Sequence, residues 1–234
     1  MTYIERWLDY AARLRDYGMI IFLTLLVVTV FVIPVVVTSS SLLDRISQDV
    51  LLSAILVSGV VAASDRSKVF IWIALVVLVA LVVRWAGWLA ASGHGFVLRD
   101  YFGILSLTLL GAVIAKQVFG AGAITRDRMM GAVALYIMVG LVWADAYQLI
   151  YRTIPGAFAG SSAQDGSADR STWVYFSFVT LTTVGYGDIT PAARAARSLA
   201  NLEGLIGQLY PAIVLARLVS LQVSGVGSDK DPSS

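Results

Sequence analysis

The chain has no cysteine, a single histidine and few charged residues. Without cysteine it can form neither a disulfide nor a thiolate nucleophile, and one histidine excludes a site built from several histidine ligands. Charged residues make up 14% of the 234 residues, compared with about 25% in soluble domains. Hydrophobic residues make up 58%, and the mean hydropathy is +0.81. This composition predicts a protein that lies mostly in lipid.

The charge balance and the polar residues argue against two further classes of protein, nucleic-acid-binding proteins and enzymes. A net charge of +2 is too small to indicate a nucleic-acid partner. The sequence has no nucleophile–base pair and no spacing typical of metal ligands. We therefore expect no enzymatic activity and no bound cofactor.

Apolar segments predict an all-α membrane protein with six transmembrane helices. They cover residues 19–39, 50–64, 69–91, 101–122, 129–152 and 192–222. A span needs about 20 apolar residues, so the second segment has to extend back through Ile46. Charged or small polar clusters separate the segments.

Basic residues alternate between the connecting segments and predict the orientation of the chain. One set of connections carries several of them, namely Arg6, Arg13 and Arg15, then Arg66 and Lys68, then Arg126 and Arg128. The intervening connections carry Arg45 alone and Arg99 alone. Because cytoplasmic loops are enriched in Lys and Arg, we expect a multi-pass protein of the cell membrane with both termini in the cytoplasm.

The two ends of the sequence are polar. In residues 1–18, apolar residues recur at helical spacing with charges between them, at Trp7, Leu8, Ala11 and Leu14. This pattern indicates an amphipathic helix on the cytoplasmic face of the membrane, or alternatively a short solvated helix packed on the first span. It lacks the uninterrupted apolar stretch of a signal peptide. Residues 223–234 form a cytoplasmic tail too short for a folded domain.

Residues 183–188 read Thr-Val-Gly-Tyr-Gly-Asp, after Thr180-Leu181-Thr182 and shortly before Pro191. This motif resembles the selectivity filter of the tetrameric potassium channels, and the resemblance is strong over residues 129–222. Over residues 1–128 only the number of spans is similar. The resemblance implies a passive, potassium-selective channel, with K⁺ as the permeant ion. Because one chain supplies one of four filter strands, it also implies a homotetramer surrounded by membrane lipids.

The resemblance gives each residue of the motif a role. The backbone carbonyls of Thr183, Val184, Gly185 and Tyr186, with the Thr183 hydroxyl, would form stacked K⁺ sites in place of the hydration shell. Gly185 and Gly187 can adopt positive φ without a Cβ clash, so successive carbonyls can face one axis. The side chains of Val184 and Tyr186 would pack away from that axis.

The segment before the motif has the length of a short helix. Residues 172–182 would extend ~16 Å as a helix, which is too short to span, so we expect a re-entrant pore helix. Its negative dipole end would point at the cation. Thr182, Tyr175 and Asp188 are expected to support the filter, because family members pair this aspartate with an aromatic donor on the pore helix. Residues 153–171 read as an external loop.

The last span carries the expected gate. By position, Gly207 corresponds to the hinge glycine of the family, although close helix packing explains a glycine here equally well. Pro211 favours a kink, while Gln208 and Ala212 would face a water-filled cavity. Glu203 lies one turn before Gly207. It either gives the cavity a negative field or bonds to the pore helix behind the filter, and we favour the second interpretation.

Other charges at membrane depth suggest pairing or a position at the interface. Arg84 and Asp145 fall in the outer halves of their spans and are expected to pair, while Arg217 is expected to reach the inner interface. Voltage-gated relatives carry regularly spaced arginines in the fourth span, whereas residues 101–122 contain only Lys116. We therefore expect weak voltage dependence and a non-sensing four-span region over residues 19–128, followed by a pore domain over 129–222.

Two other functions are compatible with the sequence. A non-selective cation channel is the first, although loose filters usually replace the residue at Tyr186. A non-conducting, regulatory membrane protein is the second. An ion-coupled transporter subunit would need several filter repeats in one chain or a partner, and neither is visible in the sequence.

Overall fold

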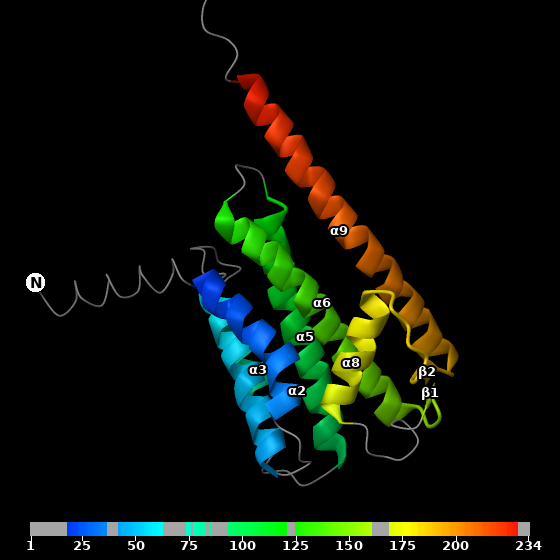
Figure 1. Ribbon diagram of the computed structural model, residues 1–234. Coiled ribbons are helices and arrows are strands. Elements are labelled where there is room, and N and C mark those ends of the chain that lie inside the picture. The colour runs from blue at the N-terminus through cyan, green and yellow to red at the C-terminus, as the bar shows by residue number, and fades with distance from the viewer. Residues whose placement is uncertain are drawn as a thin grey trace, which may run out of the picture.

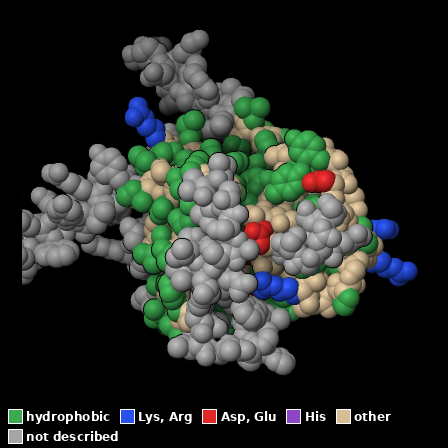
Figure 2. Space-filling view, turned by 60° about the horizontal axis from the view of Figure 1, so that its bottom comes forward, with side chains coloured by type: hydrophobic (Ala, Val, Ile, Leu, Met, Phe, Trp, Pro, Cys, Tyr) green, Lys and Arg blue, Asp and Glu red, His purple; other side chains and the backbone are tan. Residues whose placement is uncertain are grey.

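The computed structural model describes residues 18–36, 42–62, 74–75, 77–82, 85, 93–120, 125–160 and 169–228 (Figure 1). The predicted amphipathic helix before residue 18, most of the predicted span 69–91 and the end of the tail lie outside the described residues. The described part is mainly helical, with one short antiparallel strand pair. On the face shown in Figure 2, hydrophobic side chains cover much of the described surface, and few charged side chains are visible.

Residues 18–27 are helical and continue into a π-helical turn, η1, at Val28–Val32. The other elements are α2 (Ile33–Val36), α3 (Leu42–Ala62), α5 (Gly93–Val118), α6 (Arg126–Thr153), β1 (Phe158–Ala159), α8 (Arg170–Leu181), β2 (Thr190–Pro191) and α9 (Arg194–Ser228). Helix α5 begins well before residue 101, where the apolar segment begins. Hydropathy marks the apolar part of a helix, whereas its backbone hydrogen bonds continue into the polar part.

Three helices in the described part of the chain are long and apolar enough to cross a membrane. They are Asp100–Val118, Arg126–Thr153 and Arg194–Arg217. Two shorter apolar helices, Gly18–Val32 and Asp49–Val60, accompany them. The protein is therefore a helical membrane protein, and the number of six spans stays a prediction.

Helix α6 lies at the centre of the described fold. It packs along α5 on one side and against α8 on another, and it also contacts α9. The core between α5 and α6 is built from fully buried aliphatic side chains such as Leu110, Ile114 and Leu141. Helix α9 diverges from this bundle, and its C-terminal part extends beyond the other helices (Figure 1). One of its faces is thus left uncovered by the other described residues.

The region after α6 differs from the predicted external loop. Phe158 pairs with Pro191 and Ala159 pairs with Thr190, so β1 and β2 form an antiparallel ladder. Ala157 and Phe158 are buried, which makes the first part of 153–171 a packed element and not a solvated loop. Two-residue strands are too short to show an alternating pattern, and the sequence therefore gave no sign of them. The ladder fixes the chain just after residues 183–188.

Candidate functional site

Helix α8 is the short helix that precedes the Thr-Val-Gly-Tyr-Gly-Asp motif, and it is close to the predicted one. It covers Arg170–Leu181, so it begins two residues earlier than expected. Asp169 caps its N-terminus, because its Oδ1 accepts hydrogen bonds from the Thr172 amide at 3.0 Å and the Ser171 hydroxyl at 2.7 Å. Aspartate is one of the residues preferred at a helix N-cap. The sequence analysis did not use it.

The backbone of the motif alternates between two conformations. Thr183, Gly185 and Gly187 have φ of 58°, 58° and 80°, whereas Val184 and Tyr186 between them are not among the positive-φ residues. The positive φ expected for both glycines is confirmed. Such an alternation turns successive peptide groups toward a common side. Thr183 is the one described non-glycine residue with positive φ, a conformation that costs about 1–3 kcal/mol.

The amides of the motif and its carbonyls have different environments. The N–H of Thr183 donates to Thr180 O at 2.9 Å, and those of Val184 and Gly185 donate to Val179 O at 3.0 and 3.3 Å. The first amides of the motif are therefore held by the C-terminal end of α8. By contrast, none of the carbonyl oxygens of residues 183–186 accepts a hydrogen bond from another described residue. These oxygens are free to meet a ligand.

Side chains around the motif lie on its outer side and at its base. The Tyr186 ring stacks parallel to the Tyr175 ring, with centroids 6.4 Å apart. Asp188 raises the pKa of the Tyr175 phenol, mainly by accepting its hydrogen bond. At the end of α8, the Thr182 hydroxyl donates to Phe178 O at 2.6 Å. Val184 is 53% exposed in the single chain, so its side chain is not yet covered.

Glycine is required where α9 crosses the end of α8. A Cβ on Gly207 would lie 1.8 Å from Leu181 O and 2.8 Å from Leu181 C. Both atoms are backbone, so no side chain can move aside. Of the two explanations for this glycine, the structure displays close packing. One turn earlier, a Cβ on Gly204 would lie 3.9 Å from Thr180 O, which is ordinary contact.

Glu203 is completely buried between three helices. Its Oε2 accepts a 2.6 Å hydrogen bond from the Tyr147 hydroxyl of α6, and its Oε1 accepts one of 2.5 Å from the Ser177 hydroxyl of α8. The Ser177 oxygen also lies 2.7 Å from Gly140 O. The structure thus has the favoured arrangement, in which Glu203 bonds to the helix behind the motif. The sequence did not identify Tyr147 or Ser177, because neither belongs to a local pattern.

Asp145 has a buried partner that the sequence did not predict. Its Oδ1 lies 2.8 Å from Nε of Arg170, the first residue of α8, and both side chains are buried. The expected pair of Asp145 with Arg84 is not tested, because Arg84 lies outside the described residues. Arg170 was read as part of a loop, and that boundary hid its pair with Asp145. A buried ion pair therefore ties the start of α8 to α6.

The expected gate residues lie on the exposed face of α9. Gln208, Pro211 and Ala212 are all exposed in the single chain. Gln208 Nε2 donates to the Thr183 hydroxyl at 2.9 Å, which links α9 directly to the base of the motif. The helix continues through Pro211, where the missing N–H leaves Gly207 O without its usual helical partner.

Comparisons with known proteins identify the class of this region. Residues 135–223 match the family model described as ion channel. The chain is 29% identical over 126 residues to protein LctB of Bacillus caldotenax, covering 51% of this chain and 92% of that protein. Protein LctB of Geobacillus stearothermophilus is 28% identical over 125 residues, with the same coverage.

A further relative is two pore potassium channel c of Oryza sativa subsp. japonica, 40% identical over 70 residues. That alignment covers 30% of this chain and 15% of the plant protein. No solved structure gives a significant match. Together with the apolar helices, the family match supports an ion channel in a membrane, which is a transport function.

Proposed function

We propose that the protein is a passive, potassium-selective channel whose filter is residues 183–187. One observation carries the proposal: the amides of Thr183, Val184 and Gly185 are held by α8, while the carbonyls of residues 183–186 accept no hydrogen bond from the described residues. A dehydrated cation needs a ring of oxygens in place of its water shell. Backbone oxygens without partners, arranged on an alternating backbone, meet that need. K⁺ is then the permeant ligand, and no cofactor takes part.

We also propose that the protein forms a homotetramer. One chain offers one strand of carbonyls, and a ring around one axis requires several. In the most apolar stretch of α9, 11% is buried within its own chain, whereas the buried share of the corresponding stretch of α6 is 56%. Large side chains of α9 such as Leu205, Leu209 and Ile213 are about half exposed. Neighbouring chains and a central water-filled cavity would account for these surfaces, and lipids would cover the outer ones.

In this arrangement α9 is the inner helix and carries the gate near Pro211. The Gln208–Thr183 hydrogen bond connects a movement of that helix to the innermost ion site. The described part of α5 has Lys116 as its one basic residue within the span Asp100–Val118. Moving one charge through the field gains ~2.3 kcal/mol per 100 mV, so we expect shallow voltage dependence. Both termini would be cytoplasmic.

Tracer flux into liposomes tests the proposal. Purified protein should take up rubidium, barium should block the uptake, and sodium should be excluded. Gly185→Ala should abolish uptake, because an L-residue is strained at φ 58° and the carbonyl would turn. Gly156→Ala is the matched control, since Gly156 also has positive φ (71°) and open space around it, outside the filter.

Each outcome has a clear meaning. Loss of flux in the Gly185 variant with normal flux in the Gly156 variant supports the assignment. Equal sodium and rubidium uptake would favour the non-selective cation channel. Normal flux in Gly185→Ala would refute the filter.

A further inference from the structure

The oxygen atoms around Glu203 form a row that crosses three helices. Tyr147 of α6 donates to Glu203 Oε2 at 2.6 Å. On the other side of the carboxyl group, the Ser177 oxygen of α8 lies 2.5 Å from Oε1 and 2.7 Å from Gly140 O of α6. All three distances are those of O–H···O hydrogen bonds. Each of the three contacts in this row therefore requires one proton.

The hydroxyl groups of the row supply too few protons. Tyr147 and Ser177 have one hydroxyl proton each, and the backbone carbonyl of Gly140 has none to give. If Glu203 is ionised, the Ser177 proton can lie toward Oε1 or toward Gly140 O, but not toward both. The other contact then brings two acceptor oxygens together at 2.5 or 2.7 Å with no proton between them. Because the lone pairs of such oxygens repel each other, the row needs a third proton.

A proton on the carboxyl group completes the row. We propose that Glu203 is a neutral carboxylic acid whose proton lies on Oε1. The Oε1 hydroxyl then donates to Ser177, Ser177 donates to Gly140 O, and Oε2 remains the carbonyl oxygen that accepts from Tyr147. Every contact in the row becomes a hydrogen bond, and every donor points the same way. The proton thus links α9 to α8, and through Ser177 to α6.

The surroundings of Glu203 favour the neutral form. Both Glu203 and Ser177 are completely buried. Neither of the ion pairs found between described residues includes Glu203. A buried carboxylate without a cationic partner is costly, and such a group usually becomes neutral. Burial therefore supports what the hydrogen-bond count requires.

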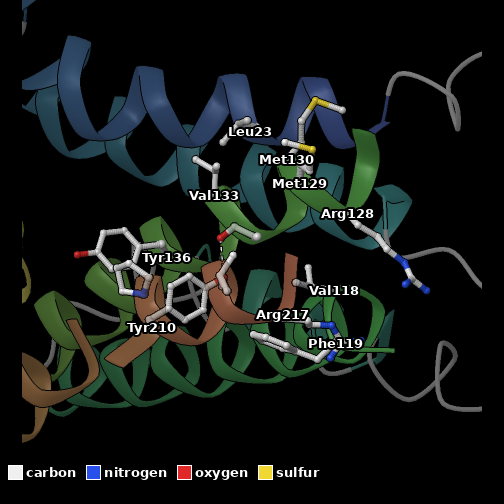
Figure 3. A pocket seen from close by; sticks show the side chains of 13 residues that line it. Leu23, Val118, Phe119, Arg128, Met129, Met130, Val133, Tyr136, Tyr210 and Arg217 are labelled. Atoms are coloured by element: carbon white, nitrogen blue, oxygen red, sulfur yellow. Dashed lines mark hydrogen bonds between the residues drawn. The ribbon is translucent and has the colours of Figure 1, made fainter. Parts of the chain in front are cut away.

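The ionisable groups near Glu203 do not provide a positive charge. On α6 these groups are the phenols of Tyr147 and Tyr136, and Tyr136 interacts with Glu203 electrostatically. Tyr136 lines one end of a mainly apolar cavity of about 450 Å³ (Figure 3), and apolar cavities stay dry. On α8 the one charged residue is Arg170, which is paired with Asp145. On α9 the residues one turn before and after Glu203 are not ionisable.

Loss of the proton would loosen the support of the filter segment, an inference that rests on the proposed channel function. An ionised Glu203 leaves Ser177 with two acceptors and one proton, so α8 loses its bond to α6 or to α9. Leu181 ends α8 one turn beyond Ser177, and Thr183 follows two residues later. A displacement of α8 therefore reaches the innermost proposed ion site. Glu203 is thus a positioning residue, and release of its proton lowers conduction.

Infrared spectroscopy of the purified protein detects the proton without requiring conduction. A neutral carboxylic acid has a carbonyl stretching band above the amide I band, whereas a carboxylate lacks it. At neutral pH, wild-type protein should have this band and Glu203→Gln should lose it. Asp127→Asn is the matched control, because it makes the same change at an exposed carboxylate in the first turn of α6. Absence of the band from the wild type, or its persistence in Glu203→Gln, would overturn the proposal.

A second variant locates the proton within the carboxyl group. Tyr147→Phe keeps the buried ring and removes the hydroxyl that donates to Oε2. Because Oε2 is the carbonyl oxygen in the proposed acid, the band should shift to higher frequency. An unshifted band would place the proton on a different oxygen and refute the proposed direction of the row.

Flux at two pH values separates the regulation from the channel function. Between about pH 7 and about pH 9, below the ordinary pKa of tyrosine near 10, the band and rubidium uptake of the wild type should decrease together. Glu203→Gln should take up rubidium equally at both pH values, since its amide donates to Ser177 and has no proton to lose in this range. A constant band, or the same decrease of uptake in Glu203→Gln, would refute the regulation. Absence of uptake at both pH values, with the band intact, would refute the channel and leave the neutral acid in place.

Discussion

Replacement of Gly207 by alanine tests how α9 holds the base of the filter segment, residues 183–187. The distance from the new Cβ to Leu181 O would have to increase from 1.8 Å to at least 3.4 Å. The backbone of α9 and the end of α8 would therefore have to move apart by about 1.6 Å. Leu181 ends α8 and lies two residues before Thr183, so this displacement reaches the innermost proposed ion site. Overpacking of this kind costs about 1–3 kcal/mol. The gain in helix propensity from glycine to alanine, about 1 kcal/mol, offsets part of it.

Gly204→Ala provides the matched control, because it gains the same propensity on the same helix. Its Cβ meets nothing closer than 3.9 Å. We expect Gly204→Ala to melt at or above the wild-type temperature, and Gly207→Ala to melt below it with reduced rubidium uptake and weaker exclusion of sodium. Thermal unfolding in detergent and liposome flux measure the two effects. If Gly207 were only a hinge, its alanine variant would change the open probability and keep both stability and selectivity. That result, or identical behaviour of the two variants, would refute the packing explanation.

Three further substitutions address the contacts around α8. Glu203→Gln should keep assembly and flux, because an amide can accept from one hydroxyl and donate to the other. Glu203→Leu leaves the Tyr147 hydroxyl without its acceptor, which costs about 1–3 kcal/mol, while the Ser177 hydroxyl can still donate to Gly140 O. Equal melting of both variants would contradict this network. Asp145→Asn leaves the Arg170 guanidinium buried without its counter-ion. A broken buried pair costs about 3–5 kcal/mol, so this variant should melt at a lower temperature. An unchanged melting curve would disprove the role of the pair. Gln208→Leu should assemble normally but alter the rubidium-to-sodium uptake ratio, since it removes the bond to Thr183; a wild-type ratio would show that the bond has no role in conduction.

The sequence predicted the features of the site that depend on short segments. Gly185 and Gly187 have the positive φ that their missing side chains permit, and α8 lies within two residues of its expected bounds. Backbone preference and helix length are local properties, so a motif of six residues contains them. The role of the motif in ion selectivity stays a prediction.

Contacts between distant residues could not be predicted in this way. Glu203 was recognised as a buried charge, but its partner Tyr147 is 56 residues away. The pair of Asp145 with Arg170 was not predicted, because Arg170 was assigned to a loop and lies 25 residues away. Depth along a helix can be counted from sequence, but the direction in which a side chain faces its neighbours depends on how the helices cross.

The β1–β2 ladder makes the two ends of the filter segment mechanically unequal. Beyond its outer end, two backbone pairs join the chain to the segment after α6, and a Cβ on Gly160 would lie 2.1 Å from Asp188 O. At its inner end, its first amides bond to the adjoining helix α8, and its hydrogen bond to α9 is a single side-chain bond from Gln208 to Thr183. A side chain can rotate away without disturbing the backbone, whereas the outer attachment yields only if paired strands separate. In the proposed channel, rearrangement of the ion pathway should therefore start from the side of α9, with the opposite end of the filter segment acting as the rigid frame.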